Sequence, residues 1–380
     1  MERKKILITG GAGFIGANLA LYLKGRGHDV SVLDNLSEQV HGSDPENTSA
    51  LYNAVRHQVN FIKGTVTSPG DWKKAIGENE VIVHLAAETG TGQSMYHISH
   101  YVETNIGGTA IMLDILTNTK TKIKKVVLAS SRAIYGEGKY FSKELGYVYP
   151  AHRRAEDMDA GNFEVTWPGA MHPLELSATD EGSKIHPSSV YGITKQNQEQ
   201  MLMLVCKSIG IVPVVFRYQN VYGPGQSLSN PYTGILSIFS ALIKNKKTIN
   251  IFEDGKESRD FIYIDDVVRA TTLGIEKEDA NAEVFNVGTG VATTVMDVAA
   301  LLVKNYGIDV LLQVTGNYRV GDIRHNYADT TKIEKLLGFI PSVSFSDGIK
   351  KFTDWVNGQD ISSSRYDESI REMKEKGLMK

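Results

Sequence analysis

The chain has 380 residues, of which 41 are basic and 44 are acidic, so its formal net charge is −3. This balance offers no strongly basic surface, and we expect neither nucleic acid nor a membrane surface as a partner. The single cysteine, Cys206, excludes a disulfide framework and a thiolate metal site, and its apolar helical surroundings favour a place in the core. No metal site is expected. Because no apolar run approaches about 18 residues, we expect a cytoplasmic protein without a membrane-spanning helix.

Short apolar runs alternate with helical patterns in the first half of the chain. Strands are predicted over 5–9, 29–33, 59–62, 80–85, 125–130 and 212–217, and helices over 14–26, 71–76, 104–118 and 190–208. Such alternation is typical of an α/β fold with a parallel, doubly wound sheet. Ligands bind these sheets beyond the carboxyl ends of the strands, so candidate site residues are sought just after each strand.

The first strand leads directly into a glycine-rich turn. Residues 9–16 read Thr-Gly-Gly-Ala-Gly-Phe-Ile-Gly, which places Gly10, Gly13 and Gly16 where the strand meets the next helix. Glycine permits a tight turn and a close approach of backbone to a pyrophosphate, whose charge the helix N-terminus favours. An ordinary tight turn is the alternative. The strand before it and the second strand after the helix favour a dinucleotide site.

The second predicted strand ends in Asp34, which indicates the type of dinucleotide. A carboxylate here is placed to accept hydrogen bonds from the adenosine ribose, and it would repel a 2′-phosphate. No arginine or lysine lies between Asp34 and Val40 to neutralise such a phosphate, so NAD is favoured over NADP. A turn or helix cap before Asn35 is the alternative role for this carboxylate.

The regular alternation breaks over residues 136–187, which are rich in glycine, proline and charge. We predict a long excursion over the active edge of the sheet that covers the substrate, with a structural or oligomer-covering role as the alternative. A smaller lobe is predicted over 221–357, with helices 233–246, 264–276 and 293–306 and strands near 248–252, 283–287 and 308–314. It is interleaved with a cofactor-binding domain over 1–220. The polar tail, 358–380, is expected to be a solvated helix or a frayed end.

A tyrosine and a lysine lie four residues apart, at Tyr191 and Lys195, and therefore on one face of the predicted helix. A nearby ammonium lowers the pKa of a phenol from about 10, which makes it a usable base for a hydroxyl whose carbon loses hydride. Ser131, at the end of strand 125–130, is placed to hydrogen-bond the reacting oxygen. The alternatives are a surface Tyr–Lys pair and a serine that caps a strand end.

Several strings along the chain carry a family resemblance. They are 9–16, Asp34-Asn35-Leu36, His84-Leu85-Ala86-Ala87, Asn105, Ser130-Ser131, Tyr191 with Lys195, 217–224, Arg259-Asp260-Phe261, 285–288 and Arg319-Val320-Gly321-Asp322. Over about residues 4–355 the chain resembles the extended short-chain dehydrogenase/reductases, and among them the NAD-dependent nucleotide-sugar epimerases and dehydratases. The resemblance implies a Rossmann fold with a smaller C-terminal α/β substrate lobe.

The resemblance also implies roles for individual residues. It makes Ser131, Tyr191 and Lys195 catalytic. Around NAD it places Gly10, Gly13, Phe14, Ile15, Gly16, Asp34, Asn35, Leu36, Thr65, Val66, Leu85, Ala86, Ala87, Asn105, Tyr191, Lys195 and Tyr218. Around a nucleoside-diphosphate sugar it places Ser131, Arg132, Asn220, Arg259, Arg319 and Asp322. It further implies a homodimer through helices 104–118 and 190–208.

The residues after Ser131 distinguish reactions within this family. The 4,6-dehydratases have Thr-Asp-Glu there, because elimination of the 6-hydroxyl needs an additional acid and base. This chain has Arg132 and Ala133, which resembles the 4-epimerases of dTDP- or UDP-hexoses. A nucleotide-sugar dehydrogenase or 4-keto reductase with net redox turnover is the alternative, and a non-catalytic NAD-binding protein is a further one.

Two positions depart from the family pattern. Gly64-Thr65-Val66 lacks the aspartate that commonly follows the third strand and meets adenine, which puts that contact in doubt. Gln219 stands before Asn220 where an aromatic residue is usual, so the sugar pocket is expected to differ from that of other members.

Overall fold

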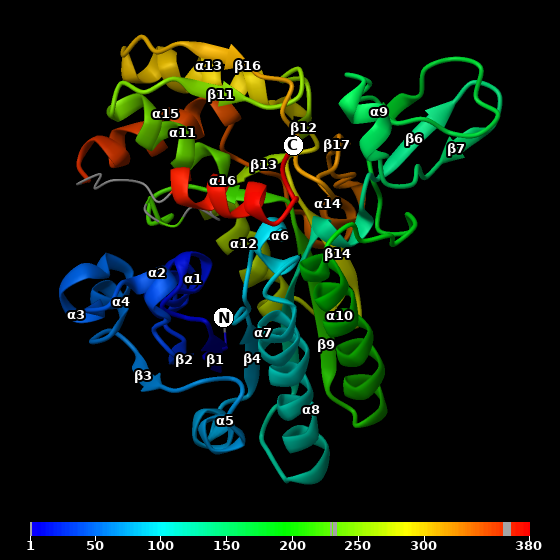
Figure 1. Ribbon diagram of the computed structural model, residues 1–380. Helices are drawn as coiled ribbons and strands as arrows, with labels where there is room; N and C mark the ends of the chain where they lie inside the picture. The colour runs from blue at the N-terminus through cyan, green and yellow to red at the C-terminus, as the bar shows by residue number, and fades with distance from the viewer. Residues whose placement is uncertain (1, 229, 231–233, 360–365) are drawn as a thin grey trace.

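A seven-stranded parallel sheet forms the centre of the computed structural model, which describes residues 2–228, 230, 234–359 and 366–380 (Figure 1). The strand order is β14-β9-β5-β4-β1-β2-β3. The bounds are β1 Lys5–Thr9, β2 Asp29–Asp34, β3 Asn60–Lys63, β4 Val81–His84, β5 Lys125–Ser131, β9 Val212–Tyr218 and β14 Val284–Val287. All neighbouring strands pair in parallel, which confirms the predicted doubly wound sheet. From β1 the chain adds β2 and β3 on one side and then β4 and β5 on the other, so the strand order reverses between β1 and β4. The carboxyl ends of these two strands therefore form the crevice where ligands bind in such folds.

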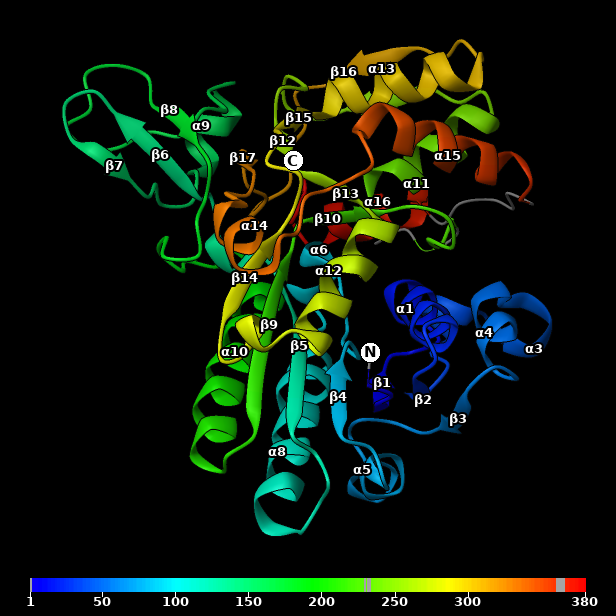
Figure 2. The same ribbon diagram turned by 180° about the vertical axis from the view of Figure 1, so that it is seen from behind.

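Helices cover both faces of this sheet (Figures 1 and 2). One face carries α1 Phe14–Gly25 and α12 Ile264–Glu276, and the other carries α5 Pro69–Ile76, α8 Gly108–Asn118 and α10 Val190–Ser208. Successive strand side chains point to opposite faces, so Ile6 and Ile8 enter one core while Leu7 enters the other. Cys206 on α10 is fully buried in the second core, as predicted.

The helix predicted over 104–118 begins earlier, with a π-helical turn over Val102–Gly107 before α8. The predicted placement of strand 283–287 and helix 264–276 in the smaller lobe is wrong. The strand, as β14, extends the large sheet beside β9, and the helix packs on that sheet as α12. A short strand buried on both faces has the same apolar pattern in either sheet, so its sequence does not identify its neighbour.

The smaller lobe lies above the carboxyl ends of the large sheet in Figure 1. Its helices are α11 Ile235–Lys244, α13 Val295–Tyr306, α14 Thr331–Leu337 and α15 Phe345–Asn357. Its short strands form three small sheets among the described residues: β11 Ile249–Ile251 with β16 Leu312–Val314, β10 Asn220–Tyr222 with β13 Phe261–Tyr263, and β12 Ser258–Arg259 between β15 Thr293–Thr294 and β17 His325–Asn326. Most of these strands are too short for periodicity to reveal.

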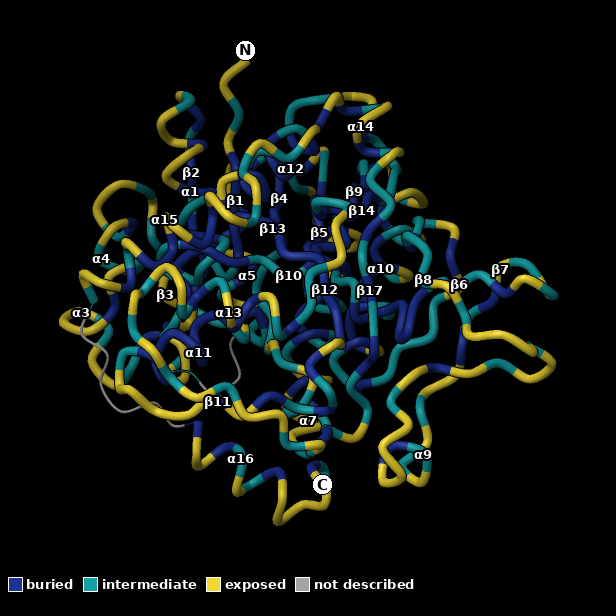
Figure 3. The backbone as a smooth tube through the Cα atoms, turned by 90° about the horizontal axis from the view of Figure 1, so that it is seen from above, coloured by how far each residue is buried: buried dark blue, intermediate teal, exposed yellow. Residues whose placement is uncertain are grey.

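Residues 136–187 form a small module that projects beside the lobe (Figures 1 and 3). It contains the antiparallel strands β6 Lys139–Ser142, β7 Gly146–Val148 and β8 Glu175–Ser177, together with α9 Ala155–Asp159. Tyr140, Val148 and Val165 give it an apolar cluster of its own. The sequence indicated a long irregular excursion, and it contains more regular structure than its composition suggested.

The tail was predicted to be a solvated helix or a frayed end; it contains a helix, but one face of that helix is buried. Residues Tyr366–Glu375 form α16, which lies beneath the lobe and next to α6 Thr91–Ser94 in Figure 1. Tyr366, Ser369 and Met373 are buried, and so is Met379 near the end of the chain. The apolar residues recur at helical spacing among many charges, so overall polarity concealed an amphipathic helix. None of the described helices combines the length and the apolar character needed to cross a membrane.

Candidate active site

A cavity of about 740 Å³ opens at the carboxyl ends of the central strands. Its volume falls in the usual range for small-molecule and cofactor sites. The predicted site residues that line it are Gly10, Gly13, Phe14, Ile15, Gly16, Asp34, Asn35, Thr65, Val66, Leu85, Ala86, Ala87, Ser131, Tyr191, Lys195 and Tyr218. Segments far apart in the sequence therefore meet here as predicted.

The glycine turn is packed so closely that side chains are excluded. Gly10 has φ +67°, and a Cβ there would lie 2.8 Å from the backbone nitrogen of Ala86. A Cβ on Gly16 would lie 2.2 Å from the carbonyl oxygen of Gly10. Gly13 is the N-cap of α1 and supplies no side-chain cap, and the first turn holds no acidic residue. The helix N-terminus is therefore suited to a pyrophosphate, because its N–H groups and dipole favour an anion.

Asp34 lines the cavity and also organises its wall. Its Oδ2 accepts a hydrogen bond from the Ala12 backbone N–H at 2.9 Å, and its Oδ1 accepts one from that of Leu36 at 2.8 Å. Both roles considered for this carboxylate, ribose ligand and turn cap, are therefore compatible with the structure. The Leu36 side chain is buried and is not among the residues that line the cavity. Its backbone N–H, rather than its side chain, serves the site.

Tyr191 and Lys195 reach the cavity from the first turns of α10. The helix begins at Val190 because the Ser189 side chain accepts a hydrogen bond from the Gly192 N–H. A Cβ at Gly192 would lie 2.6 Å from the carbonyl oxygen of Ala133, so this glycine lets α10 approach the segment after β5. Tyr191 thereby lies beside Ser131, the last residue of β5. The Lys195 ammonium donates to the carbonyl of Ala129 at 2.9 Å and lies 5.9 Å from the centre of the Tyr191 ring.

The electrostatics of this group differ from the prediction. Burial raises the pKa of Tyr191, and the Ser131 hydrogen bond and the positive charge of Arg132 oppose that rise. Burial also lowers the pKa of Lys195 to about 7, against the influence of Glu199. The pKa of Tyr191 is therefore raised rather than lowered as expected, and the Lys195 ammonium is held at the Ala129 carbonyl. Arg132 is the cation that acts on the phenol.

Asn105 lies behind the cavity rather than on its wall. Its amide oxygen accepts from the Glu88 N–H at 2.8 Å, and its nitrogen donates to the Glu88 carbonyl at 3.1 Å and to Thr194 Oγ1 at 3.0 Å. It therefore joins the segment after β4 to α10, three residues from Tyr191. The structure shows it positioning residues that line the cavity, and its predicted contact with the cofactor stays a prediction.

The predicted substrate residues form a polar cluster beyond Ser131, outside the cavity wall described above. Arg132 Nε donates to Asn220 Oδ1 at 3.0 Å, and Arg259 Nη2 donates to Asp322 Oδ1 at 2.9 Å. Burial opposes ionisation of Asp322, but Arg259, Arg319 and Arg132 outweigh it and lower the pKa of this carboxyl. Burial and the charge of Arg259 lower the pKa of Arg132 to about 10. The cluster thus concentrates positive charge near Tyr191.

A second set of buried charges borders this cluster and was not expected from the sequence. Arg153, from the 136–187 module, donates to both carboxylate oxygens of Glu253 at 2.8 and 2.7 Å and to the Asp322 carbonyl at 3.0 Å. Arg324 is fully buried and pairs with Glu253 at 2.9 Å and Asp254 at 2.7 Å. These contacts join residues 70 to 169 positions apart, so no local sequence pattern indicates them.

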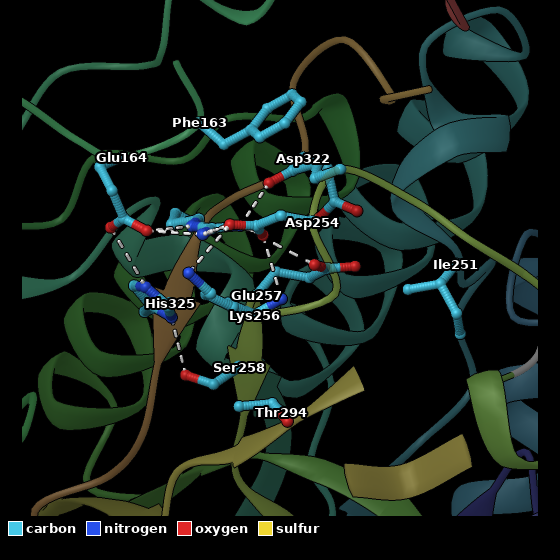
Figure 4. A network of polar contacts seen from close by, with 12 residues as sticks. Phe163, Glu164, Ile251, Asp254, Lys256, Glu257, Ser258, Thr294, Asp322 and His325 are labelled. Carbon is cyan, nitrogen blue, oxygen red and sulfur yellow. Dashed lines mark hydrogen bonds and ion pairs between the residues drawn. The ribbon is translucent and has the colours of Figure 1, made fainter. Parts of the chain in front are cut away.

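Figure 4 shows how the network continues through Glu164, Asp254, Glu257 and His325. Glu164 receives a hydrogen bond from Arg324 Nε at 3.0 Å, and His325 bonds Ser258 at 2.8 Å. The network attaches the 136–187 module to the lobe. No residue of that module lines the cavity among the described residues, so its predicted role as a cover for the sugar stays a prediction.

Sequence reasoning missed residues on the outer wall of the cavity. The short helices α2 Glu38–His41, α3 Pro45–Thr48 and α4 Ala50–Val55 contribute one side, and the lobe contributes the other. The missed lining residues include Gln39, Val40, His41, Thr48, Ser49, Leu51, Gln226, Leu228, Trp355 and Gln359. A Cβ at Gly225 would lie 2.9 Å from a methyl carbon of Leu51, so the two sides meet closely. Their spacing follows no motif.

The two departures from the family pattern have structural counterparts. Asp71 Oδ2 accepts from the Thr65 N–H at 2.9 Å, so a carboxylate from α5 supports the turn after β3. A Cβ at Gly64 would lie 2.7 Å from the Asp71 carboxyl carbon, which explains the small residue there. Gln219 is buried at the cavity, and neither polar atom of its side chain has a hydrogen-bond partner among the described residues.

Known proteins resemble this chain in sequence and in fold. Residues 6–154 and 165–288 match the NAD dependent epimerase/dehydratase family. The chain is 36% identical to a dTDP-L-rhamnose 4-epimerase of Burkholderia thailandensis over 94% of this chain and 96% of the relative. A UDP-glucose 4-epimerase of Thermotoga maritima, solved with UDP-glucose, superposes with a TM-score of 0.75 at 30% identity over 93% and 98% of the two chains.

A UDP-glucuronic acid 4-epimerase of Bacillus cereus, solved with UDP-glucuronic acid and NAD, superposes with a TM-score of 0.74 at 26% identity over 93% and 99% of the two chains. The glycine cradle, the cavity beside it and the carboxylate of Asp34 fit NAD in this chain. The chain therefore belongs to the NAD-dependent epimerase/dehydratase family, and its cofactor is NAD.

Proposed function

We propose that this enzyme is a nucleotide-sugar 4-epimerase that interconverts dTDP-L-rhamnose and its C4 epimer. One observation carries the proposal: Ser131, Tyr191 and Lys195 meet on the wall of the cavity that also holds the glycine turn and Asp34. A base and a nicotinamide site thus share one chamber. The 36% identity to a dTDP-L-rhamnose 4-epimerase supports this sugar, and solved relatives that bind UDP-sugars support UDP-hexoses as the second candidate.

In this proposal Tyr191 removes the proton from the sugar 4-hydroxyl, and Ser131 hydrogen-bonds the same oxygen. NAD, which the glycine turn and Asp34 would hold, would supply the hydride acceptor for C4 and then the hydride donor for the opposite face of the sugar. Between these steps the 4-keto sugar rotates so that its opposite face meets the cofactor, and Tyr191 then returns its proton to the oxygen. Lys195 holds the cofactor ribose, and Arg132 contributes positive charge beside the phenol. Proton and hydride both return, so the reaction has no net redox change.

The arginine cluster anchors the diphosphate while the sugar turns. Arg259 and Arg319 supply guanidinium groups, which bind phosphate oxygens in a bidentate manner. Asp322 supports Arg259, and Asn220 supports Arg132, through the hydrogen bonds described above. Arg132 lies between this cluster and Tyr191, and we assign it to the oxygen atoms that join the sugar to the diphosphate.

A 4,6-dehydration does not suit this site. Elimination of a 6-hydroxyl needs an acid and a base beside Ser131, whereas Arg132 is cationic and Ala133 is an apolar, buried residue. A dehydrogenase or reductase would exchange its cofactor with solvent at each turnover. The wall formed by α2–α4 and the lobe favours retention of the cofactor, as an epimerase requires.

We further propose a homodimer. Ile98, Val102, Ile193 and Leu204 lie exposed on α7 Ile98–Tyr101, the adjoining π-helical turn and α10. A second copy is expected to cover them, because clustered exposed apolar side chains on neighbouring helices mark association surfaces. Leu204→Glu should shift the protein to a monomer in sedimentation velocity. Leu145→Glu, at an exposed position of the 136–187 module, is the matched control and should leave the dimer intact.

The activity is tested with the protein as purified, after measuring its bound cofactor by absorbance and mass. It is incubated without added NAD with dTDP-L-rhamnose, UDP-glucose, UDP-N-acetylglucosamine and GDP- and CDP-hexoses, and the products are followed by NMR. We expect inversion at C4 of the dTDP sugar without accumulation of NADH. Inversion of a UDP-sugar alone would make that sugar the substrate in place of dTDP-L-rhamnose. Turnover that requires a stoichiometric amount of added nicotinamide dinucleotide would overturn the assignment as an epimerase.

A further inference from the structure

The C-terminal segment, defined here as residues 366–380, contacts three separate parts of the molecule that border the proposed sugar site. These parts are the loop that carries Arg319, the segment after β4 next to Tyr191, and the 136–187 module. Figure 3 shows the segment at the edge of the molecule, with buried positions interspersed along it. Its position at the junction of these parts suggests more than a capping helix.

The first contact is a backbone pairing with the Arg319 loop. Tyr318 and Lys380 exchange two hydrogen bonds, from N–H to carbonyl, at 2.9 and 3.1 Å. The Val320 N–H donates to the Leu378 carbonyl at 3.0 Å, and Arg319 and Met379 form an antiparallel bridge. The backbone on both sides of Arg319 is therefore held by the last three residues of the chain.

Side chains hold the same loop. The Arg319 guanidinium lies 5.1 Å from the centre of the Phe252 ring, an arrangement that favours a cation. Burial raises the pKa of Tyr366, the first residue of α16, and the charge of Arg319 opposes that rise, which places the two groups next to each other. The guanidinium is thus directed by one aromatic residue of the lobe and one of the C-terminal segment.

The second contact joins α16 to the segment after β4. Tyr96 donates to Glu372 Oε2 at 3.1 Å, and the Lys376 ammonium lies 4.9 Å from the centre of the same ring. Met373 is buried, and its sulfur lies 3.4 Å from where a Cβ on Gly92 would stand. Ser94, in the same segment, accepts a hydrogen bond from the Tyr191 N–H at 3.0 Å.

The third contact involves the 136–187 module. Asp159 accepts a hydrogen bond from the Tyr318 hydroxyl at 2.6 Å and pairs with the Lys380 ammonium at 3.1 Å. The end of the chain therefore lies between the module and the lobe. The backbone pairing is the stronger part of this junction, because the Lys380 pair is exposed and exposed pairs contribute little.

We propose that the C-terminal segment is a positioning element for nucleotide-sugar binding, which holds Arg319 in the orientation that receives the diphosphate. This inference rests on the proposed function of Arg319. The segment acts through Arg319 and touches neither the reacting carbon nor the cofactor cavity, so its loss should weaken binding of the diphosphate and leave the cofactor in place. None of its residues is among those that line the cavity.

The test is a chain that ends at Gly377, which keeps α16 and removes the three residues paired with the Arg319 loop. We expect Kd for dTDP and UDP, measured by calorimetry, to rise at least about tenfold, since three backbone hydrogen bonds that order the loop are lost. KM for the nucleotide sugar should rise in parallel, while kcat and the NAD content change less than about twofold. Unchanged Kd and KM in the folded shortened chain would overturn the inference.

Two point variants separate the pairing from general stability. Lys380→Ala keeps the backbone hydrogen bonds and removes the exposed ion pair, so its Kd should change less than about twofold. Glu375→Ala alters an exposed residue of the same helix and is the matched control. If the chain ending at Gly377 does not fold, Met379→Asp provides the second route. It puts a charge into a buried position of the pairing and should raise Kd without loss of NAD.

The outcomes distinguish this inference from the proposed function. If the full-length chain binds neither dTDP nor UDP, the diphosphate site itself is refuted, and the positioning role is refuted with it. If the full-length chain binds them and the shortened chain binds equally well, only the positioning role fails. Arg319→Ala in both backgrounds completes a double-mutant cycle, in which non-additive effects on Kd are expected because the two changes act on one group.

Discussion

The two sides of the candidate active site are built in different ways. The cofactor side is built from backbone N–H groups and glycines of one short turn, with the Asp34 carboxylate held by two backbone donors. The proposed sugar side is built from buried arginines and carboxylates of distant segments, such as Arg259 with Asp322, and the network of Arg153, Arg324 and Glu253 borders it. A cofactor that is retained needs a site that fits it closely. A substrate that must leave can be held by charge-assisted hydrogen bonds, which form and break. The contrast leads to four tests, in order of decreasing expected effect.

The largest effect is expected where the two sides meet, at Tyr191. Tyr191→Phe removes the group that transfers the proton, and kcat should fall by about 10²- to 10⁴-fold. NAD content and Kd for dTDP or UDP should stay near the wild-type values, because the ring remains and neither site loses a contact. The measurement is single-turnover kinetics beside cofactor analysis. Retained turnover would assign the proton transfer to another group.

The cofactor side is broken most directly by filling its closest approach. Gly16→Ala places a Cβ 2.2 Å from the Gly10 carbonyl oxygen, which forces the turn to shift. NAD content after purification should fall about tenfold or more, since the N–H groups no longer converge on the pyrophosphate. Gly25→Ala, at the other end of α1, meets nothing within 4 Å and is the matched control. Equal NAD content in both variants would contradict the cradle.

The sugar side is weakened by removing one guanidinium. Arg259→Ala should raise KM for the nucleotide sugar about 10- to 100-fold, the scale of one or two charge-assisted hydrogen bonds. NAD content should be retained, which separates this variant from Gly16→Ala. The control is Lys256→Ala, a nearby exposed cation of the same strand region, whose KM is expected to be close to wild type. A loss of NAD with no change in KM would reverse the assignment of the two sides.

The smallest effects are in stability, where two buried groups contribute with opposite pH dependence. Glu137, on the sugar side, accepts a hydrogen bond from the Arg324 N–H, and His84, at the end of β4 beside Thr9, bonds the Thr9 and Thr109 hydroxyls. Burial raises the pKa of Glu137 from 4.5 to about 7 in the folded protein. The stabilisation that Glu137 contributes to the free energy of unfolding is complete below pH 4.5 and is lost as the pH rises through 7. Burial lowers the pKa of His84 from 6.5 to about 3, so its contribution is present above pH 6.5 and is lost as the pH falls.

Paired variants measure these two terms by denaturant unfolding at several pH values. Relative to Glu137→Gln, the wild-type protein should lose unfolding free energy between pH 4.5 and 7, by roughly 1.4 kcal/mol for each unit of pKa shift. Relative to His84→Gln, it should lose unfolding free energy as the pH falls below 6.5. Parallel slopes for the two pairs would show that the two sides do not differ in this respect.

What could be predicted from the sequence also differs between the cofactor side and the sugar side. The six predicted strands of the first half were confirmed, and so were Asp34, Tyr191 and Lys195 as residues of one cavity. Each depends on local order: periodicity defines the strands, and fixed spacing defines the motifs. The positions of Asn105 behind the wall and of β14 in the large sheet were not predictable, because both depend on which segments pack together.

The sequence by itself determined the fold class, the glycine cradle and the motif residues of the cavity such as Asp34, Tyr191 and Lys195, since these follow from backbone geometry and spacing over a few residues. Only the tertiary structure decided how Arg153, Arg324 and Glu253 pair, and how the C-terminal segment holds the Arg319 loop. A buried charge is stable only with its partner, and that partner is brought near by the packing of whole layers rather than by spacing along the chain.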